Sequence, residues 1–471
     1  MIDGSEKPEG LQDLVHEMKR DWDERARQNA KWFIDKARWP QSVRMEPTDA
    51  QFNETGKLEV SRLILCDLAL LTSNRDPKDM RVLEIGCGIG RMTRELAMFF
   101  GEVYATDVSG EMIKQAQARL KGLANVHLRE TNGLDFADLP SNHFDLVFSA
   151  YVFQHVPSAE VIRANIVDAY RVLKPGGVMK FQTNGITAFD FEGVTKDTWV
   201  GASFPEAEIR RFATEVNAQL ISIFGSGMQY CWTTLRKRAS ATRSVPQFAI
   251  AQPVIEAYGR ASDPRLKEIP MTGEHAAVSL IVSGLIPEEV DANSLIVEIN
   301  DQPVLPYYVG PVIPKQAAIL SAEQSASLDR LTQIEATIPT GVASGQGHVR
   351  VRLGSDEVSA PVTIELREVQ PTVPKIVAVM NASDHGTDIY ARGVKSSFVI
   401  HAEGLDEAAD TGNVRIQVGS RIIKPGFISF EPRKGVYQVA AQLPADIGPG
   451  VADLRLHFGV VQSPAVSLHI R

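Results

Sequence analysis

The sequence predicts an α/β domain with a mostly parallel sheet, preceded by a helical segment and followed by two all-β sandwich domains. Its length of 471 residues exceeds what one hydrophobic core usually organises, so several domains are expected. Up to about residue 240, short apolar runs alternate with helical stretches, which is typical of a parallel sheet covered by helices. Beyond residue 250 the helical period fades, and Pro and Gly separate short alternating runs, as in β-sandwiches.

Composition and charge narrow the class of protein. The net charge of −9 at pH 7 argues against a nucleic-acid partner, because non-specific binding to nucleic acid depends on a basic surface. No apolar run reaches the length of a membrane span, and the first residues lack the apolar core of a secretory signal. Three scattered cysteines predict neither a disulfide framework nor a metal site. We therefore expect a cytoplasmic protein with no nucleic-acid or membrane partner and no bound metal.

Residues 1–74 are predicted to form a helical cap. The stretch DWDERARQNAKWFIDKARWP sets Trp22, Trp32, Phe33 and Trp39 in a charged background. Such a helix either packs its aromatic face on the sheet domain or lies as a lid over an active site, and the sequence leaves both interpretations open.

Residues 75–240 carry the strands and helices of the α/β domain. The expected strands are RVLEIG (81–86), EVYATD (102–107), NVHLRE (125–130), FDLVFS (144–149) and GVMKFQT (177–183). The runs RMTRELAMFF, SGEMIKQAQARLK and SAEVIRANIVDAYRVLK are expected to be helices, and the last of them is expected to end at Pro175-Gly176-Gly177. A helix over residues 205–218 and a terminal hairpin complete the domain.

An internal repeat divides the rest of the chain into domains at residues 250–369 and 370–471. PVIEAYGRASD (253–263) matches PKIVAVMNASD (374–384), and QIEATIP (333–339) matches QVAAQLP (438–444). The offset falls from 121 to 105 residues, so about sixteen extra residues lie in the first copy between Pro306 and Gln333. The copies resemble immunoglobulin-like domains of the IPT/TIG or bacterial type, a likeness of fold that implies no activity.

Three alternating glycines follow the first expected strand in VLEIGCGIGR (82–91). A glycine turn between a strand and a helix commonly holds phosphate. A P-loop does not fit, because Arg91-Met92 stands where that motif needs Lys followed by Ser or Thr. The dinucleotide fingerprint does not fit either, because Arg91 or Thr93 takes the place of its third glycine, depending on the register. What remains is the pattern acidic-x-Gly-x-Gly-x-Gly at the end of a first strand.

This pattern resembles the first motif of class I S-adenosylmethionine-dependent methyltransferases, and four further motifs follow it in the order of that family. The resemblance covers about residues 75–238 and implies a Rossmann-like, seven-stranded methyltransferase domain with S-adenosyl-L-methionine as cofactor. It also implies that Glu84 holds the ammonium group of the cofactor and that Asp107 accepts hydrogen bonds from its ribose. The implied cofactor-binding residues are Glu84, Gly86, Cys87, Gly88, Gly90, Asp107, Val108, Met112, Asn132, Gly133, Leu134 and Ser149.

Three members of this set have particular roles under the resemblance. Met112 places an apolar side chain against the adenine face. Asn132 stands where the family usually has Asp, and its side-chain oxygen still offers an acceptor to the adenine amino group, with Asp135 as a rival. Cys87 is expected to be structural rather than nucleophilic, because no His partner is evident from the sequence.

The stretch after the fourth strand faces the methyl acceptor in the resembling family. Tyr151 and Gln154, together with Trp22 of the cap, are therefore candidate acceptor contacts, and His155 is the candidate general base. A base is needed only for a weak nucleophile such as a hydroxyl, and the alternative for His155 is a loop histidine before Pro157. We expect methyl transfer by in-line displacement to a small-molecule or glycan-like acceptor.

Two other functions are weighed against this one. The first is a cofactor-binding scaffold whose immunoglobulin-like repeats bind a protein partner or mediate self-association. The second is a nucleotide-binding oxidoreductase, which binding of a dinucleotide instead of S-adenosylmethionine would reveal.

Overall fold

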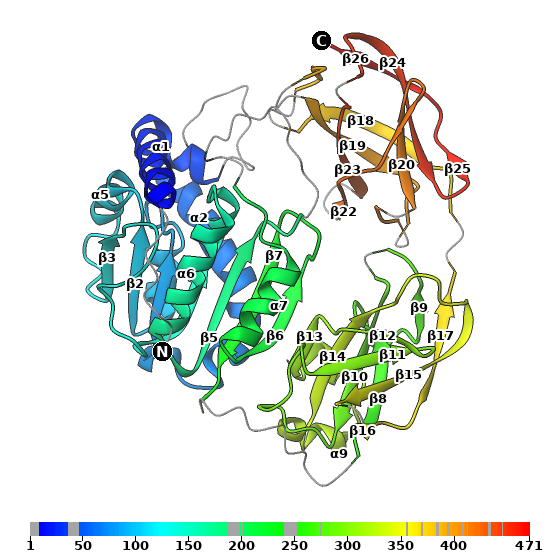
Figure 1. Cartoon of the computed structure of the whole chain (residues 1–471), viewed down its shortest axis with the longest axis horizontal. Helices are drawn as coiled ribbons and strands as arrows, with labels where there is room; N and C mark the ends of the chain where they lie inside the picture. Colours follow the sequence, from blue (N-terminus) through cyan, green and yellow to red (C-terminus); the bar gives the residue numbers. More distant parts are fainter. Residues whose placement is uncertain are drawn as a thin grey trace. The chain divides into compact units, whose positions relative to one another are not determined.

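Figure 1 shows the computed structural model of the chain. The described residues are 9–35, 47–186, 198, 201–239, 252–273, 275–354, 357–368, 371–382, 386–392, 396–406, 409–411, 413–431, 435–444 and 446–471. The chain divides into two compact units, residues 1–191 with 195–245 and residues 192–194 with 246–471. Within the described ranges, no helix combines the length and the apolar character needed to cross a membrane.

Seven strands of the first unit lie in one sheet (Figure 1). They are β1 (Arg81–Ile85), β2 (Glu102–Asp107), β3 (Val126–Glu130), β4 (Phe144–Ser149), β5 (Leu173–Thr183), β6 (Ala218–Phe224) and β7 (Cys231–Lys237). Their order is β3-β2-β1-β4-β5-β7-β6. The first five are parallel, whereas β7 is antiparallel to both β5 and β6. This order confirms the Rossmann-like sheet of the first unit that the resemblance implied.

Burial explains why these runs form central strands. All six residues of β4 are buried, and Arg81 alone in β1 is partly exposed. Val82, Leu146 and Val178 come from three strands and share one hydrophobic cluster with side chains of the covering helices. A parallel sheet covered on its faces buries successive side chains, so its strands are continuous apolar runs rather than alternating ones.

The helices of this unit are α1 (Glu9–Ile34), α2 (Asp49–Leu63), α3 (Leu68–Thr72), α4 (Thr93–Phe99), α5 (Gly110–Arg119), α6 (Ala159–Val172) and α7 (Glu206–Glu215). Short 3-10 turns lie at Leu65–Asp67, Pro77–Asp79 and Phe153–His155. Ser109 and Ser158 accept backbone N–H groups at the starts of α5 and α6, and Thr48 forms a capping box with Gln51 at the start of α2. These caps satisfy amides that have no partner inside the helix.

The fifth strand begins earlier than the sequence predicts. Helix α6 ends at Val172, and β5 begins at Leu173 instead of Gly177. The register with β4 jumps from Phe144–Leu173 to Leu146–Val178, so the Pro-Gly-Gly segment forms a bulge inside the strand. Gly176 has a φ of 79°, a left-handed conformation that favours glycine, and this is why the segment reads locally as a helix stop.

Helix α1 of the predicted cap contains a break at Asn29. The backbone there is extended, with φ −172° and ψ 83°. The Asn29 side-chain oxygen accepts the N–H of Trp32 at 3.0 Å, as an N-cap residue does at the start of a helix. The helix therefore consists of two helical segments joined at Asn29. Trp39, which the sequence also assigns to the cap, lies outside the described residues.

The second unit is built of strands. Its first half contains β8 (Val254–Arg260), β9 (Glu268–Pro270), β10 (Ala277–Ser283), β11 (Leu295–Ile299), β12 (Gln302–Val304), β13 (Tyr308–Pro311), β14 (Thr332–Thr337), β15 (Gly345–Leu353), β16 (Glu357–Val358) and β17 (Val362–Arg367). Its second half contains β18 (Lys375–Asn381), β19 (Ser397–Glu403), β20 (Val414–Val418), β21 (Arg421–Ile423), β22 (Phe427–Glu431), β23 (Val436–Gln442), β24 (Gly450–Phe458), β25 (Val461–Gln462) and β26 (Val466–Ile470).

The two halves share one strand topology. The order β13-β14-β10-β8 in the first half corresponds to β22-β23-β19-β18 in the second. The pairings of β15 with β11, β16 and β17 correspond in the same way to those of β24 with β20, β25 and β26. Between β13 and β14 the first half inserts α8 (Pro314–Ala317), α9 (Ala322–Ser325) and a 3-10 turn at Leu328–Arg330, where the repeat offset predicted extra residues.

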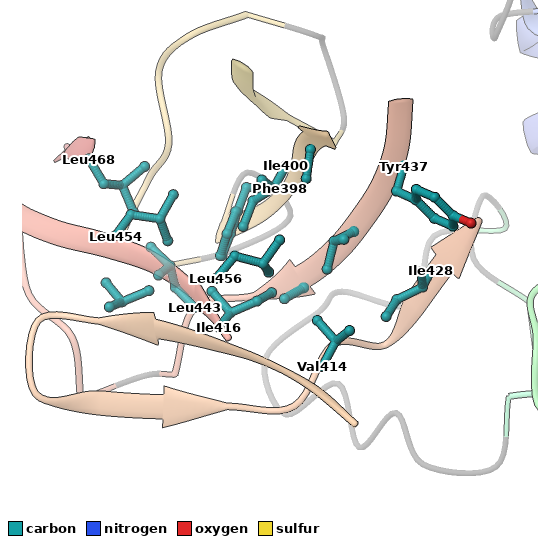
Figure 2. Packing of buried hydrophobic residues seen from close by; sticks show 14 of the residues in the cluster. Phe398, Ile400, Val414, Ile416, Ile428, Tyr437, Leu443, Leu454, Leu456 and Leu468 are labelled. Atoms are coloured by element: carbon teal, nitrogen blue, oxygen red, sulfur yellow. The ribbon is translucent and has the colours of Figure 1, made fainter. Parts of the chain in front are cut away.

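The second half encloses its own hydrophobic core between two sheets. Figure 2 shows Phe398 and Ile400 of one sheet lying against Ile416, Leu454 and Leu456 of the other. Along β20 and the second half of β24, buried residues alternate with partly exposed ones, as expected where a sheet turns one face inward.

Candidate cofactor and acceptor site

The glycine turn between β1 and α4 depends on three left-handed residues. Gly86, Gly88 and Gly90 have φ values of 72°, 56° and 79°. The N–H groups of Gly86 and Cys87 both donate to the carbonyl of Thr106 on β2, at 2.8 and 2.9 Å. A Cβ atom at Gly86 would clash with the side chain of Val152. The turn therefore presents bare main chain and leaves no room for side chains at these positions.

Asp107 ends β2 beside this turn. One of its carboxylate oxygens accepts the N–H of Gly88 at 2.8 Å, and the other accepts the N–H of Ser109 at 2.9 Å. Burial raises the pKa of Asp107 to about 6, although the amides of Ser109, Gly88 and Val108 favour the charged form. A carboxylate offers about four lone-pair positions, so it can still accept a hydrogen bond from a ligand.

Glu84 lies beneath the turn on β1 and is buried. Its carboxylate accepts the hydroxyl proton of Thr93 at 2.6 Å. Burial raises the pKa of Glu84 to about 7, while Thr93 and the nearby Arg91 counteract the rise. A buried carboxyl group that titrates near neutrality favours a cationic ligand group close by.

Arg91 is a buried cation that the sequence analysis considered only as a misfit to the P-loop. Its guanidinium lies 3.4 Å from Asp35 and donates to the hydroxyl of Thr55 at 3.2 Å. Its Nε is buried and has no hydrogen-bond partner among the described residues. α2 crosses so closely that a Cβ at Gly56 would clash with the Arg91 carbonyl. An unsatisfied buried donor next to a glycine turn suits an anionic ligand group.

The residues predicted to contact adenine lie on α5 and in the loop after β3. Met112 is buried in a cluster with Ile89 of the glycine turn. The Asn132 side-chain oxygen accepts the N–H groups of Leu134 and Asp135 at 2.8 and 2.9 Å, which is an Asx-type turn. Its amide nitrogen donates to Asp135 at 2.8 Å. Asn132 therefore shapes the loop, and both lone pairs of its oxygen are already used.

The apolar face of α1 covers these predicted cofactor residues. Ile34 Cδ1 lies 2.8 Å from the position that a Cβ of Gly88 would occupy, and Val15 Cγ1 lies 2.7 Å from that of Gly133. Ala26 and Ala30 pack in the cluster of Met112, with Trp22 against it. The cap therefore lies along the predicted site from the glycine turn to the loop after β3, a position that fits both the packing and the lid interpretation.

Polar contacts hold the same helix at the start of α5. The Asp23 carboxylate accepts the hydroxyl of Ser109 at 2.6 Å and the N–H of Glu111 at 3.1 Å. Lys19 donates to the carbonyl of Val108 at 3.3 Å and pairs with Glu130 at the end of β3. These bonds place a carboxylate of the cap near Asp107, and that charge contributes to the raised pKa of Asp107.

The end of β4 carries the predicted acceptor-side residues. The hydroxyl of Ser149, which is buried, donates to the carbonyl of Ile85 at 3.4 Å and links β4 to β1. Tyr151 has a φ of 61°, an uncommon conformation for a non-glycine residue, and its N–H donates to the side-chain oxygen of Gln182 at 3.1 Å. Strained residues of this kind often lie at functional sites.

His155, Gln154 and Trp22 are brought together, as the sequence analysis grouped them. The rings of Trp22 and His155 meet edge to face with centroids 5.4 Å apart. His155 Nε2 lies 3.1 Å from the Gln154 amide nitrogen, which is buried next to Gln182. A neutral imidazole would accept that amide proton.

Cys87 has the environment of a structural residue. It is buried, and burial raises the pKa of its thiol well above the ordinary value, which disfavours the nucleophilic thiolate. Throughout the part of the chain that the structure describes, no three His, Cys, Asp or Glu side chains group around a common point where a metal ion could bind.

The sequence did not predict four side chains that lie next to Tyr151. Glu59 and Arg62 come from α2, and Tyr230 and Trp232 come from the region of β7. Their patterns in the sequence are those of an ordinary amphipathic helix and an ordinary strand, so no local signal distinguishes them.

Comparisons with known proteins find similarity over part of the chain. Residues 82–177 match a family described as a methyltransferase domain. S-adenosylmethionine, the cofactor expected from the glycine turn, is the methyl donor of that family.

Curated relatives match the same region. The chain is 37% identical to the demethylmenaquinone methyltransferase of Tropheryma whipplei over 97 residues, 20% of this chain and 38% of that protein. It is 29% identical to the ubiquinone biosynthesis O-methyltransferase of Xanthomonas oryzae pv. oryzae over 200 residues, 39% of this chain and 80% of that protein. A chondramide synthase of Chondromyces crocatus is 38% identical over 106 residues, 22% of this chain, and the match spans 3% of the synthase.

Solved structures with partial likeness include a SAM-dependent methyltransferase from Aquifex aeolicus. It has a TM-score of 0.30 and 21% identity, and the match covers 40% of this chain and 98% of that one. A structure described as a DhpI–SAH complex has a TM-score of 0.34 and 22% identity, with 48% of this chain and 98% of that one covered.

Proposed function

We propose that the first unit binds S-adenosylmethionine and transfers its methyl group to a small-molecule acceptor. The observation that carries this proposal is the three-glycine turn at positive φ, with Asp107 bonded to its middle amide and the methyltransferase match running through it. When bound, S-adenosylmethionine supplies an electrophilic methyl group on a positively charged sulfur.

The residues around the turn fit the parts of this cofactor. Asp107 has lone pairs free to accept hydrogen bonds from ribose hydroxyls. Glu84 would pair with the ammonium group, and the unsatisfied Arg91 Nε would donate to the carboxylate of the same amino-acid end. One anion and one cation on either side of the turn suit a zwitterion better than a phosphate, which would need donors only.

We assign the adenine to the space bounded by Val108, Met112, Gly133 and Leu134. Met112 and Leu134 are buried and supply apolar contact. Asn132 acts through the shape of its turn rather than through its side-chain oxygen, whose acceptor positions are taken. Gly133 has no side chain, and Val15 and Val108 approach it too closely to leave room for one.

Helix α1 serves as a movable cap in this proposal. Ile34 packs on Gly88 where the main chain must be reached, so the cap shifts before the cofactor can bind. The break at Asn29 provides two segments that can move separately. Closure then excludes water from the reacting groups, and orientation of reactants within such a site supplies roughly 7–11 kcal/mol of barrier reduction.

The acceptor is assigned to the side of Tyr151, Gln154, His155 and Trp22. His155 remains a candidate general base, and the contact between its Nε2 and Gln154 has to open before it can take a proton. The relatives named for quinone biosynthesis act on small molecules by their names, which favours a small-molecule acceptor over a glycan-like one here.

The all-β unit is assigned a binding role. We propose that its two halves are immunoglobulin-like domains that hold a protein partner or a second copy of the chain. The shared topology and the separate core of the second half support independent domains of this type. Removal of residues 250–471 should leave cofactor affinity unchanged and alter acceptor turnover or oligomeric state, measured by calorimetry and light scattering.

Calorimetric titration tests the central proposal. S-adenosylmethionine should bind with a micromolar Kd, whereas NAD should show no heat of binding under the same conditions. Tight binding of NAD without a response to S-adenosylmethionine would favour the oxidoreductase hypothesis instead.

A further inference from the structure

A buried carboxylate outside the cofactor site lies against Tyr151. Glu59 of α2 is 4% exposed, and its Oε2 accepts the phenolic proton of Tyr151 at 3.0 Å. Arg62, one turn further along α2, donates from Nη2 to the same Glu59 oxygen at 2.8 Å and to the Tyr151 oxygen at 2.5 Å. The three side chains form a closed polar triangle.

The backbone and the neighbouring rings hold Tyr151 in this position. Its N–H bond to Gln182 supports the left-handed backbone conformation. Tyr230 and Trp232 meet its ring edge to face, with centroids 5.8 and 5.9 Å away. A strained residue persists only where its surroundings determine its conformation, and here the strain directs the phenol at Glu59.

The hydrogen bonds of Tyr151 leave one position open. A phenol has one proton to donate and two lone pairs that accept. The proton goes to Glu59 and one lone pair accepts from Arg62, so a second donor can still bind the oxygen. The triangle borders solvent, since the Arg62 side chain is 65% exposed. The triangle is therefore not sealed inside the protein.

We propose, given the methyltransferase function above, that Tyr151 and Glu59 relay a proton from a hydroxyl group of the methyl acceptor. The acceptor O–H proton moves to Tyr151 Oη as the phenolic proton moves to the Glu59 carboxylate. The electron pair freed on the acceptor oxygen forms the new bond to carbon, and the pair of the broken carbon–sulfur bond stays on the sulfur of the donor. Tyr151 is then catalytic, and Glu59 and Arg62 act through it.

Charge and burial around the phenol support this division of roles. Burial raises the pKa of Tyr151, and the nearby Glu59 raises it further, while Arg62 and Arg91 oppose the rise. Tyr151 thus stays protonated and passes protons on instead of keeping a negative charge. Tyr230, the other titratable group against the triangle, also has a raised pKa because of burial.

Apolar side chains beside Tyr151 indicate the substrate class. Tyr230 touches the ring of Tyr151 and is 42% exposed. Phe224, 44% exposed, pairs in register with Trp232, whose ring also meets that of Tyr151. We therefore assign a hydroxyl compound with an apolar body, such as a phenol or a long-chain alcohol.

The test compares Glu59→Gln and Tyr151→Phe with Glu54→Gln, a control on the exposed side of the same helix. The full chain is incubated with S-adenosylmethionine and a panel of phenols and alkanols, with aniline and thiophenol analogues, and S-adenosylhomocysteine is measured by mass spectrometry. We expect Glu59→Gln and Tyr151→Phe to lower kcat for a hydroxyl acceptor by about 10²-fold or more, with KM changed little. Glu54→Gln should change neither kcat nor KM.

A second readout is independent of turnover. In protein labelled with ¹³C at the tyrosine ring, the Tyr151 signal, identified by its loss in Tyr151→Phe, should titrate at lower pH in Glu59→Gln than in the wild type. Cofactor affinity is measured on the wild type and on every variant. A wild type that does not bind S-adenosylmethionine would refute the proposed function, independently of the relay. The relay is overturned if Glu59→Gln retains wild-type kcat, if no hydroxyl compound is methylated, or if the Tyr151 titration does not move.

Discussion

Replacing Asp107 by Ala is expected to weaken S-adenosylmethionine binding by about 1.5–3 kcal/mol, which is roughly a 10- to 150-fold rise in Kd. The carboxylate accepts the amides of Gly88 and Ser109 and still has room to accept a hydrogen bond from the ribose. A hydrogen bond to a charged group contributes about 1.5–3 kcal/mol, and the expected loss is that of one such bond to a ribose hydroxyl.

The same substitution should affect folding less than binding. Burial raises the pKa of Asp107 to about 6, so the unliganded protein carries this charge at pH 8 against an unfavourable environment. Removing the carboxylate relieves that cost and partly offsets the two lost amide bonds. The affinity is measured by calorimetry at pH 8 and the unfolding free energy by denaturant titration.

Glu102→Ala is the matched control, because Glu102 lies at the opposite end of β2 and is bonded to Arg81 on the neighbouring strand. It should leave Kd within about twofold, a difference under roughly 0.5 kcal/mol. Asp107→Ala protein that unfolds normally and binds the cofactor with wild-type Kd would refute the assignment of this carboxylate.

Three further outcomes are expected. Burial raises the pKa of Glu84 to about 7 and that of Asp107 to about 6, so affinity for a cationic cofactor should rise with pH as the two groups ionise. If binding needs both anions, Kd measured by calorimetry in matched buffers should be roughly 20-fold lower at pH 8 than at pH 6. A pH-independent Kd would contradict this expectation. Gly86→Ala should lower the unfolding free energy by at least about 2 kcal/mol, because the new Cβ adds a clash to backbone strain. Gly122 has a φ of 97° and open space around it, so Gly122→Ala should show the strain alone. Equal losses of unfolding free energy in the two variants would disprove the clash. Ile34→Ala should lower the Kd for the cofactor by roughly threefold to tenfold, because the closed cap of the free protein loses about 1 kcal/mol of packing. Weaker binding in stopped-flow measurements would show that Ile34 instead holds the bound cofactor.

Local sequence patterns sufficed for much of the first unit. The runs around Val82, Leu146 and Val178 are continuously apolar because the parallel sheet buries their successive side chains, and this can be seen without knowing the neighbours. The start of the fifth strand was mispredicted at the Pro175-Gly176-Gly177 segment, because the local pattern there is ambiguous. A helix stop and a strand bulge need the same residues, and pairing with β4 decides between them.

The candidate site divides along the same line. The proximity of Glu84, the glycines and Asp107 could be predicted, because a strand, a tight turn and the tip of the adjacent strand follow one another between Arg81 and Asp107. The role of Asn132 could not be predicted in this way, because its side-chain oxygen could bind either adenine or the backbone of its own turn. In the folded loop it accepts the backbone N–H groups of the turn.

The sequence by itself determined where most strands and the glycine turn lie along the chain, because both follow from periodicity and from conformations that few residues can adopt. Only the tertiary structure decided what surrounds them. Glu59 and Tyr151 are 92 positions apart, and Ile34 meets Gly88 through a helix that shares no motif with it. Such contacts arise from helix packing across the sheet, which depends on the whole apolar surface rather than on any short stretch.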